Sequence, residues 1–564
     1  MNASETDLWV FRDGKKSVPG RKLLRELQTS IAALCRSPRD RNLQLTALIQ
    51  AGEIEAALAD TNAPTAPGFA ALTDAVAGIA FGADASALSR MIPDLETDNF
   101  PEALTISPPE GFAYYALQPL SFGDFARHSL NGGGPVAVIG IRSIGTTLSA
   151  VVGSALRSSG HSVERITVRP TGHPYDRVTQ FDVAQGSWIA RNRARRAAFI
   201  VVDEGPGRSG STFLSVGEAL LSAGVARNDV TFFGSREPDV KQLCARDAAS
   251  RWNSFRFLVA APQSQPGFDN DVYVGGGDWR KYLLGAEREW PACWPETERL
   301  KFLSFDRKRL FKFEGLGRLG NIVRERARLL HRLGFGPAVS DAGNGFTSYE
   351  IVEGRPLEPS DVTPAVLERI AQYSAMRVRE FAAENECSDD HIAEMIRFNA
   401  QTELGIDIDF DDDTFRPQQL IFADGRMQAH EWIQAQNGTL LKVDATTHGD
   451  DHFFPGPTDI AWDIAGTVVE WRLDRGATDY LVQRFQQLTG DNLRGRLPAF
   501  VFAYTVVRMA TWKMALSTVI GSAEESRVRQ AYKYYRQLAE QQLPRFQRPA
   551  SPQTIASGSP ALAA

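Results

Sequence analysis

Cysteine is scarce in this chain. Four cysteines occur in 564 residues, and no two of them form a CxxC pair. Zinc knuckles and disulfide frameworks need closely and regularly spaced cysteines, which excludes both as the basis of the fold. We therefore expect a protein of the reducing cytoplasm. The four residues are Cys35, Cys244, Cys293 and Cys387.

An excess of charge of one sign is also missing. The chain has 62 Lys and Arg against 68 Asp and Glu, a formal net charge of −6. This balance provides no overall field that would attract nucleic acid. The basic run 191-RNRARR-196 is predicted to be a solvated helix face, with a local nucleic-acid contact as the alternative. We expect small-molecule substrates.

Long apolar runs are absent as well. The N-terminal sequence MNASETDLWVFRDGKK lacks the apolar core of a secretory signal. The most apolar late stretch, 498–516, is interrupted by Arg508 and Lys513. A membrane span needs about 20 consecutive, mostly apolar residues. The stretch is therefore predicted to be a buried helix, and no membrane partner is expected.

The length of the chain indicates several domains, because a single core rarely grows beyond about 250–300 residues. Changes in composition along the chain suggest where they begin and end. We expect a helical extension (1–99), a parallel-sheet domain with a hood (100–260), a Pro-, Gly- and Trp-rich connector (261–298), a second domain (299–545) and a disordered tail (546–564).

Short apolar runs alternate with helix-like segments from residue 134 onward. The runs 135–141, 163–168, 197–203 and 229–234 are predicted to be strands, and 212–224 is predicted to be a helix. Such alternation is typical of an α/β fold, in which crossover helices connect the strands of a parallel sheet.

The segment 203-DEGPGRSGST-212 follows one of these strands. Its Gly, Ser and Thr residues lead directly into a helix, whose N-terminus offers free N–H groups and a positive dipole end to a phosphate. Asp203 and Glu204 lie at the carboxyl end of the strand, where open α/β sheets bind ligands. The pattern predicts a sugar-phosphate site; a strand-turn-helix without a ligand is the alternative.

A segment of the same kind lies upstream, where residues 141–147 link a predicted strand to a helix. Together the two segments resemble type I phosphoribosyltransferases. In that family the paired acids contact ribose hydroxyls, the later loop holds the 5′-phosphate and the earlier loop binds diphosphate. The resemblance implies 5-phosphoribosyl-1-diphosphate as donor and Mg²⁺ near Asp203 and Glu204. It implies donor contacts from Arg142, Ser143, Gly145, Thr146, Gly207, Arg208, Ser209, Gly210, Ser211 and Thr212.

The chain departs from that family's pattern in the later loop. The loop is one residue longer, and Pro206 and Arg208 stand where apolar or hydroxyl residues are more usual. A further resemblance, carried by 169-RPTGHPYDR-177 and 203-DEGPGRSGS-211, is to phosphoribosyltransferase-like proteins of tellurium-resistance gene clusters. It implies an unusual nucleoside-like product.

The segment 164–180 is rich in basic residues. In the resembled family a mobile catalytic loop closes over the diphosphate here, which implies catalytic roles for Arg169 and His173 and the exclusion of water from the reacting carbon. A hairpin with surface charges is the alternative. The same loop would contain Arg165, Tyr175 and Arg177.

The acceptor of the phosphoribosyl group cannot be identified from the sequence. In the resembled family a variable hood selects it, and residues 100–120 are predicted to form that hood. Its aromatic residues, Phe112, Tyr114 and Tyr115, would stack on a base, with a packed core cluster as the alternative.

The C-terminal half carries a second set of motifs. Lys312 lies on a predicted strand, Glu325 on the next helix, 349-YEIVEGRPL-357 has the character of a hinge, and Asp444 ends an apolar run. In this order they resemble the aminoglycoside phosphotransferase and choline kinase group, with a two-lobed α+β fold. The resemblance implies that Lys312 and Glu325 bind nucleotide phosphates, that Asp444 holds Mg²⁺, and that ATP is a ligand.

The catalytic loop of that group is not matched. Its pattern overlays on 424-DGRMQAHEWI-433 with Arg426 at the catalytic aspartate and Glu431 at the metal-binding asparagine. An arginine cannot accept a hydroxyl proton. This half is therefore predicted to be a pseudokinase, an atypical kinase that uses Asp424 or Glu431, or a domain that binds the acceptor. His430 is expected to be structural.

The sequence thus predicts an α/β protein: a parallel-sheet phosphoribosyltransferase fold joined to a two-lobed kinase-like domain. The leading hypothesis is a phosphoribosyltransferase with an unidentified acceptor. The alternatives are a sensor that binds phosphoribosyl diphosphate without turnover, and a small-molecule kinase. The sequence is also compatible with a homodimer.

Overall fold

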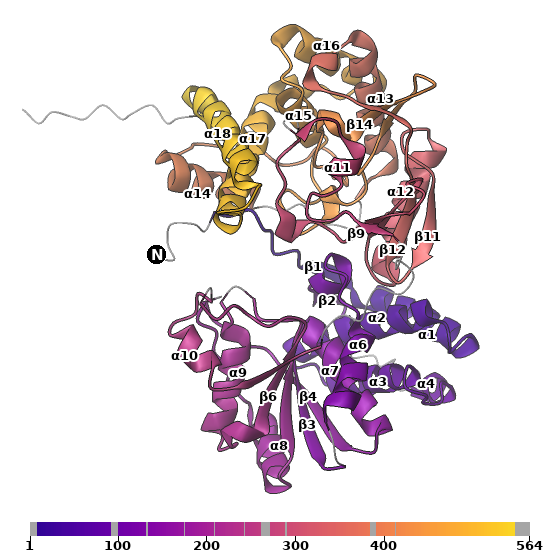
Figure 1. Cartoon of the computed structure of the whole chain (residues 1–564), viewed down its shortest axis with the longest axis vertical. Coiled ribbons are helices and arrows are strands. Elements are labelled where there is room, and N and C mark those ends of the chain that lie inside the picture. Colours follow the sequence, from indigo (N-terminus) through magenta and orange to yellow (C-terminus); the bar gives the residue numbers. More distant parts are fainter. Residues whose placement is uncertain are drawn as a thin grey trace, which may run out of the picture.

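The computed structural model describes residues 8–546 except for a few short segments, and consists of two halves stacked on each other (Figure 1). The predicted tail lies almost entirely outside the described residues. The internal segments outside the description are 92–99, 131–132, 174, 208, 242, 261–270, 288–289, 384–390 and 412.

A five-stranded sheet, with all neighbouring strands parallel, forms the centre of the N-terminal half. Its strand order is β4-β3-β5-β6-β7. The parallel α/β sheet predicted from the alternating pattern is confirmed. The strands are β3 (Pro135–Ile141), β4 (Ser162–Val168), β5 (Ala198–Val202), β6 (Val230–Gly234) and β7 (Arg256–Val259).

Helices cover both faces of this sheet. The helix after β3, α7 (Ile144–Ser158), packs on one face, and the helix after β5, α9 (Ser211–Ser222), packs on the other. The chain therefore leaves β3 toward one face of the sheet and leaves the neighbouring β5 toward the other face. We call the carboxyl ends of these two strands the switch point. Open α/β sheets bind ligands at such a place. The short α10 (Ala248–Trp252) and α8 (Val183–Ala194) pack on the α9 face.

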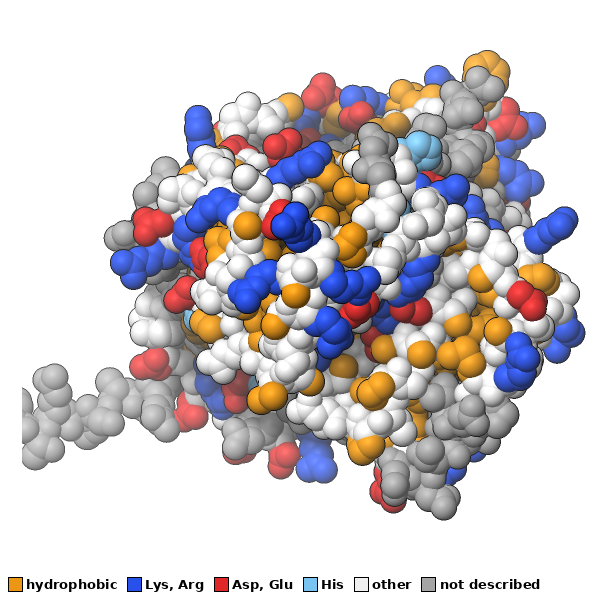
Figure 2. All heavy atoms as spheres, turned by 90° about the horizontal axis from the view of Figure 1, so that it is seen from below, with side chains coloured by type: hydrophobic (Ala, Val, Ile, Leu, Met, Phe, Trp, Pro, Cys, Tyr) orange, Lys and Arg blue, Asp and Glu red, His pale blue; other side chains and the backbone are white. Residues whose placement is uncertain are grey.

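The basic run predicted as a helix face lies at the end of α8. Arg191 and Arg195 pair with Glu164 at 3.1 Å and 2.5 Å, and their side chains stay exposed. On the face of the molecule seen from below, Figure 2 shows Lys and Arg spread among acidic, apolar and polar side chains. The run therefore has an acidic partner within the fold.

The N-terminal helices belong to the same core as the sheet. Strand β1 (Lys16–Pro19) pairs with β2 (Ala103–Ile106), and apolar residues of the helices join those of β3 and β5 in one cluster. The expected boundary at residue 99 therefore does not separate two cores. The helices are α1 (Gly20–Arg36), α2 (Arg41–Asp60), α3 (Ala66–Ile79), α4 (Ser86–Met91), α5 (Glu110–Ala113) and α6 (Pro119–Ser129).

The C-terminal half has two lobes. Its smaller lobe contains an antiparallel sheet of order β11-β12-β10-β9-β8 with α12 (Arg318–Arg332) beside it. The edge strand β8 comes from the expected connector, of which 261–270 lie outside the described residues. The strands are β8 (Val272–Tyr273), β9 (Lys301–Leu303), β10 (Arg309–Phe313), β11 (Val339–Gly343) and β12 (Phe346–Glu350).

The larger lobe is mainly helical. Helix α17 contains the apolar stretch 498–516, and its Arg508 is buried beside Glu470. No described helix is long and apolar enough to cross a membrane. The lobe comprises α11 (Arg280–Leu283), α13 (Pro364–Glu380), α14 (Ile392–Leu404), α15 (Ala461–Glu470), α16 (Arg475–Thr489), α17 (Leu497–Thr518), α18 (Glu525–Gln542) and the strands β13 (Gly354–Pro356), β14 (Trp432–Ala435) and β15 (Leu440–Lys442).

The start of the described chain ties the two halves together. Arg12 N donates to His452 O at 3.0 Å, and Phe454 N donates to Val10 O at 3.0 Å, so this segment lies on the C-terminal half. The chain then enters β1 in the N-terminal half. Leu316 and Phe346 from the smaller lobe join the core of the parallel sheet. The halves therefore share packing.

Candidate functional sites

The two predicted ligand loops meet at the switch point between β3 and β5. A Cβ atom on Gly145 would lie 2.6 Å from Val202 O and 3.4 Å from Asp203 Oδ1. Only glycine therefore permits this approach of the loop after β3 to the end of β5. The structure brings together the two segments that the sequence predicted as one site.

The loop after β3 has an unusual backbone. Ser143, the residue before α7, has φ = 93°, which a residue with a side chain rarely adopts. Such strain costs on the order of 1–3 kcal/mol and persists at sites where the surroundings enforce it. The hydroxyl of Thr146 is buried and has no hydrogen-bond partner among the described residues. The loop therefore presents the N-terminus of α7, while Arg142 stands at its start.

The loop after β5 leads directly into α9, as predicted. Gly210 is left-handed, with φ = 68°, and the helix begins at Ser211, so Thr212 lies in its first turn. The hydroxyls of Ser209 and Ser211 lie 2.9 Å apart. Apart from its neighbours in the chain, no atom of the described residues lies within 4 Å of a Cβ on Gly207. Arg208 lies outside the described residues.

The paired acids are the first two residues of the loop after β5 and are partly exposed. Burial raises the pKa of Asp203 to about 8, an effect that nearby Arg169 opposes. Burial, together with the negative charge of Glu110, raises the pKa of Glu204 to about 7. A ligand that supplies hydroxyl donors or a cation would stabilise the ionised forms.

A metal at these acids would need oxygens from the ligand. No group of three or more His, Cys, Asp or Glu suited to a metal occurs within the described part of the chain. Mg²⁺ commonly binds one or two carboxylates together with substrate phosphates and water. Asp203 and Glu204 are carboxylates of the kind that such a shared site uses.

The basic residues of the segment 164–180, predicted to form the mobile catalytic loop, lie in two different environments. Arg169 reaches the switch point, where its guanidinium donates to Arg142 O at 2.7 Å and to Ser143 Oγ at 3.3 Å. The expectation that Arg165 belongs to a mobile catalytic loop is wrong. Arg165 lies within β4, where its buried side chain pairs with Glu55 and Asp74 at 2.9 Å and 2.5 Å.

The tip of this segment is exposed. His173 lies at the tip and accepts a hydrogen bond from Tyr175 N at 3.2 Å, and Arg177 donates to Gly172 O at 2.9 Å. These contacts stay within the segment. The structure therefore places Arg169, but not His173, in contact with the earlier loop.

Asp60, on α2, is a member of this site that the sequence did not indicate. Its carboxylate pairs with Arg142 at 3.1 Å and with Arg169 at 2.6 Å. Together with Ser143 and Thr147 it lines a small cavity beside the earlier loop. The last residue of α2 lies about eighty positions upstream of the loop, and no local pattern connects them.

The hood residues have different surroundings. Phe112 is fully buried in the core of the N-terminal half, so the core alternative holds for it. Tyr114 donates a hydrogen bond to Asp450 O at 3.2 Å, and Tyr115 OH lies 3.1 Å from His452 Nε2. The two tyrosines therefore contact the C-terminal half.

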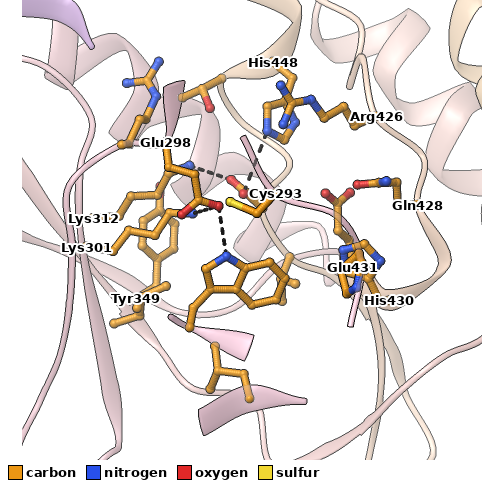
Figure 3. A pocket seen from close by; sticks show the side chains of 18 of the residues that line it. Cys293, Glu298, Lys301, Lys312, Tyr349, Arg426, Gln428, His430, Glu431 and His448 are labelled. Carbon is orange, nitrogen blue, oxygen red and sulfur yellow. Dashed lines mark hydrogen bonds and ion pairs between the residues drawn. The ribbon is translucent and has the colours of Figure 1, made fainter. Parts of the chain in front are cut away.

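A cavity of about 260 Å³ lies between the two lobes of the C-terminal half, and we call it the interlobe cleft. Figure 3 shows Lys301 and Lys312 on one side of it, with Arg426, His430 and Glu431 across the cavity. Lys312 Nζ lies 2.5 Å from Asp444 Oδ1 and 3.3 Å from Glu314 Oε1.

Glu325, which the resemblance implied to bind nucleotide phosphates together with Lys312, does not lie beside it. The carboxylate of Glu325 lies on the exposed face of α12 and pairs with Arg328 at 2.5 Å. Glu314, two positions along from Lys312, takes the place next to the lysine. Glu325 therefore has no place in the interlobe cleft.

Asp424 is held away from the cleft. It is fully buried, Tyr373 OH donates to its carboxylate at 2.5 Å, and its backbone N–H donates to Asp463 at 2.8 Å. Asp463 also accepts a hydrogen bond from Gly425 N at 2.9 Å. The alternative in which Asp424 acts on a substrate is therefore not supported, while Arg426 lines the cleft.

Other ionisable residues of the cleft are already engaged. Lys442 Nζ pairs with Glu431 at 2.8 Å, and burial raises the pKa of Glu431 to about 8. His430 stacks on Trp279, and burial lowers its pKa to about 4, consistent with the predicted structural role. His448 Nδ1 is buried and has no hydrogen-bond partner among the described residues.

A larger cavity, of about 750 Å³, lies between the two halves, and we call it the interface chamber. It shares wall residues with the interlobe cleft, so the two cavities adjoin. The residues that line both are Tyr114, Arg299, Thr447, Asp451 and His452.

No protein-family model matches the chain, and comparison with curated proteins finds no match. Among solved structures, an ethanolamine kinase from Plasmodium vivax is similar at 12% identity and a TM-score of 0.31, covering 43% of this chain and 81% of that one. Choline kinase LicA from Streptococcus pneumoniae is similar at 12% identity and a TM-score of 0.30, and the match covers 45% of this chain and 92% of that one. Macrolide 2′-phosphotransferase MphH from Brachybacterium faecium is similar at 14% identity and a TM-score of 0.29, and the match covers 42% of this chain and 88% of that one. Each of these proteins is matched over most of its own length by less than half of this chain.

Proposed function

We propose that the N-terminal half binds 5-phosphoribosyl-1-diphosphate at the switch point and transfers its phosphoribosyl group to an acceptor. The observation that carries this proposal is the meeting of the two loops at Gly145 and Val202, with Asp203 beside them. Each loop leads into the N-terminus of a helix, so two anion-binding positions flank one pair of acids.

The order of these groups matches that of a molecule with phosphate at both ends and hydroxyls between. We assign one phosphate to the N-terminus of α9, with Ser209 and Ser211, and the diphosphate to Arg142 and Arg169 at the other loop. Asp203 and Glu204 then accept hydrogen bonds from ribose hydroxyls. Cationic and N–H groups at the diphosphate stabilise the charge that develops as it leaves. When bound, Mg²⁺ would neutralise part of that charge.

Calorimetry of the full chain with phosphoribosyl diphosphate and Mg²⁺ tests donor binding. Wild-type protein should bind, and Asp203→Asn with Glu204→Gln should weaken binding at least about tenfold, because two charge-assisted hydrogen-bond acceptors are lost. Asp229→Asn, at an exposed 3-10 turn after α9, is the matched control. No binding by the wild-type protein contradicts the proposal.

Release of diphosphate distinguishes transfer from sensing. A transferase should release diphosphate when nucleobases or metabolite extracts are added, and the double variant should not. Tight binding with no release under any of these conditions would favour the sensor.

A second candidate function is nucleotide binding in the interlobe cleft. The pair of Lys312 and Asp444, at 2.5 Å, favours nucleotide binding there, because a lysine and a metal-binding aspartate are the groups that hold nucleotide phosphates and Mg²⁺ in kinases. Arg426 opposes transfer, since an arginine cannot act as a base.

We therefore expect the cleft to bind ATP without transferring its phosphate. Lys312→Met should abolish ATP binding, whereas Lys308→Met, on the turn before β10, should not. Transfer of the γ-phosphate to any small molecule would revive the kinase hypothesis.

A further inference from the structure

Arg426 is an unpaired cation in the wall of the interlobe cleft. Its side chain is half-buried and forms no hydrogen bond or ion pair among the described residues. The other cations that line the cleft each have an acid partner, at distances of 2.5 to 3.7 Å. These pairs are Arg299 with Glu314, Lys301 with Glu298, Lys312 with Asp444 and Arg508 with Glu470. A half-buried charge without a counter-ion is costly, which favours a ligand that supplies one.

Asp451 lies close enough to feel this charge but does not neutralise it. Its carboxylate is buried and accepts a hydrogen bond from Phe453 N at 2.8 Å. Burial raises the pKa of Asp451 to about 6, although the charge of Arg426 acts to lower it. No ion pair joins the two side chains in the part of the chain that the structure describes. The guanidinium of Arg426 therefore keeps its donors free.

The segment that contains Arg426 is extended, and its side chains alternate between two environments. Met427 and Ala429 are buried in the core of the C-terminal half, while Arg426, Gln428 and His430 line the cleft. Figure 3 shows these three residues, which we call the cleft row, along one side of the cavity. The amide of Gln428 has no hydrogen-bond partner among the described residues. The cleft row thus presents a free cation and a free amide to the same cavity.

The far end of the cleft row is apolar. Burial lowers the pKa of His430 to about 4, so the ring is neutral, and it stacks on Trp279 with ring centres 5.9 Å apart. Further apolar residues that line the cavity are Leu283, Leu284, Pro291 and Trp512. A ligand that extends along the cleft row therefore needs an apolar body beside its charged group. The cavity volume of about 260 Å³ lies near the lower end of the range of small-molecule sites.

We infer that the interlobe cleft binds a small organic carboxylate, whose carboxylate contacts Arg426 and Gln428 and whose apolar body lies toward Trp279. A guanidinium offers two parallel N–H groups that match a carboxylate. The single free charge favours a monoanion over a phosphate dianion, because the two lysines across the cavity are already paired with acids. This site goes beyond phosphoribosyl transfer and depends neither on that activity nor on nucleotide binding.

Saturation-transfer NMR titrations on the full chain test the ligand class, with phenylacetate and indole-3-acetate as probes. At least one of them should bind. Its uncharged amide should bind at least about tenfold more weakly, because a charge-assisted pair is lost. Neither phenethylamine, a cation of similar shape, nor phenyl phosphate, a dianion, should displace the bound carboxylate.

Variants of the cleft row locate the binding. Arg426→Gln should weaken carboxylate binding at least about tenfold, and Arg426→Lys should weaken it less, since the charge stays while the paired N–H groups are lost. Arg475→Gln, at an exposed position at the start of α16, is the matched control. The thermal unfolding midpoint of Arg426→Gln should not fall, because the side chain has no partner to lose.

A second variant keeps the test valid if Arg426→Gln fails to fold. Gln428→Leu removes the amide and leaves the charge in place, and it should weaken carboxylate binding about fivefold through the loss of one hydrogen bond. Its affinity for the uncharged amide probe should change less than its affinity for the carboxylate, because hydrogen bonds to charged groups are the stronger ones.

Several results would overturn the inference. They are absence of carboxylate binding, equal binding of carboxylate and amide, displacement by phenethylamine, and an affinity that neither Arg426→Gln nor Gln428→Leu changes. Displacement by phenyl phosphate that depends on Arg426 would show a phosphate site in place of a carboxylate site. All of these results leave the proposed function standing, since phosphoribosyl diphosphate is proposed to bind at the switch point. Failure of the full chain to bind phosphoribosyl diphosphate would likewise leave the carboxylate site standing.

Discussion

Asp60 accepts two hydrogen bonds from Arg169, at 3.0 Å and 2.6 Å, across 109 positions of the chain. It also pairs with Arg142 at 3.1 Å. One carboxylate thus engages both arginines that stand beside the loop predicted to bind diphosphate. A diphosphate bound at this loop, as proposed, would compete with Asp60 for the same guanidinium groups.

The first prediction follows from this competition. Asp60→Asn should strengthen binding of inorganic diphosphate about tenfold, because the variant frees two cations and removes a like charge from the anion's surroundings. Calorimetry with Mg²⁺ present measures the change, with Asp229→Asn as the charge-matched control. Weaker binding in Asp60→Asn would show that the carboxylate positions the arginines instead of competing for them.

The second prediction concerns the pH dependence of stability. Burial raises the pKa of Asp203 from 3.8 to about 8, so between these values the folded protein binds a proton that the unfolded chain has lost. Stability then falls as pH rises through that window. Asp203→Asn removes this contribution and should flatten the decline between about pH 5 and about pH 8.

The expected difference is on the order of 1–2 kcal/mol, less than the full shift implies, because the carboxylate is partly exposed and water relieves its burial. Thermal unfolding of wild type and variant at a series of pH values measures it. The contributions of other buried acids, such as Glu431, to the pH dependence of stability cancel when the two curves are subtracted. Parallel curves would contradict the raised pKa.

The third prediction concerns the buried ion pairs of β4. Arg165→Met should destabilise the N-terminal half by about 3–5 kcal/mol, because the buried Glu55 loses its partner. Arg157→Met removes a half-exposed ion pair with Asp74 and should cost about 1 kcal/mol or less. Urea unfolding measures both.

A double variant checks the cause of this effect. Adding Glu55→Gln to Arg165→Met removes the unpaired charge and should restore part of the lost stability. If the double variant is less stable than Arg165→Met alone, the ion pair is not what Arg165 contributes.

The sheet and both ligand loops were predictable from the sequence because their signals are local. Apolar runs of strand length mark β3 and β5, and 203-DEGPGRSGST-212 lies between a strand and a helix. Residues joined only by tertiary packing were not predictable. Tyr115 and His452 are 337 positions apart, and neither has a neighbouring motif that would pair them.

Errors in the C-terminal half have the same origin. The resemblance implied that Glu325, on the helix after the strand of Lys312, binds nucleotide phosphates together with it, but Glu325 faces solvent, and Asp444 and Glu314 lie beside the lysine instead. Helix periodicity shows that one face is polar and does not show which polar residue turns inward. The burial of Asp424 against Tyr373 and Asp463 depends on two helices distant in sequence.

The last prediction tests the contact at which the two loops meet. In Gly145→Ala the new Cβ would lie 2.6 Å from Val202 O, a backbone atom of a central strand that cannot move without disturbing the sheet. The loop after β3 must therefore shift. Overpacking of this kind costs about 1–3 kcal/mol, and displacement of the diphosphate loop should weaken donor binding at least about tenfold.

Gly186→Ala, within α8 and with no atom within 4 Å of its Cβ, is the matched control and should gain up to about 1 kcal/mol in stability. Calorimetry with phosphoribosyl diphosphate and thermal unfolding measure the two effects. Full donor affinity in Gly145→Ala would show that the close approach of the loops serves packing alone, because a site formed by both loops cannot keep its geometry when one of them moves.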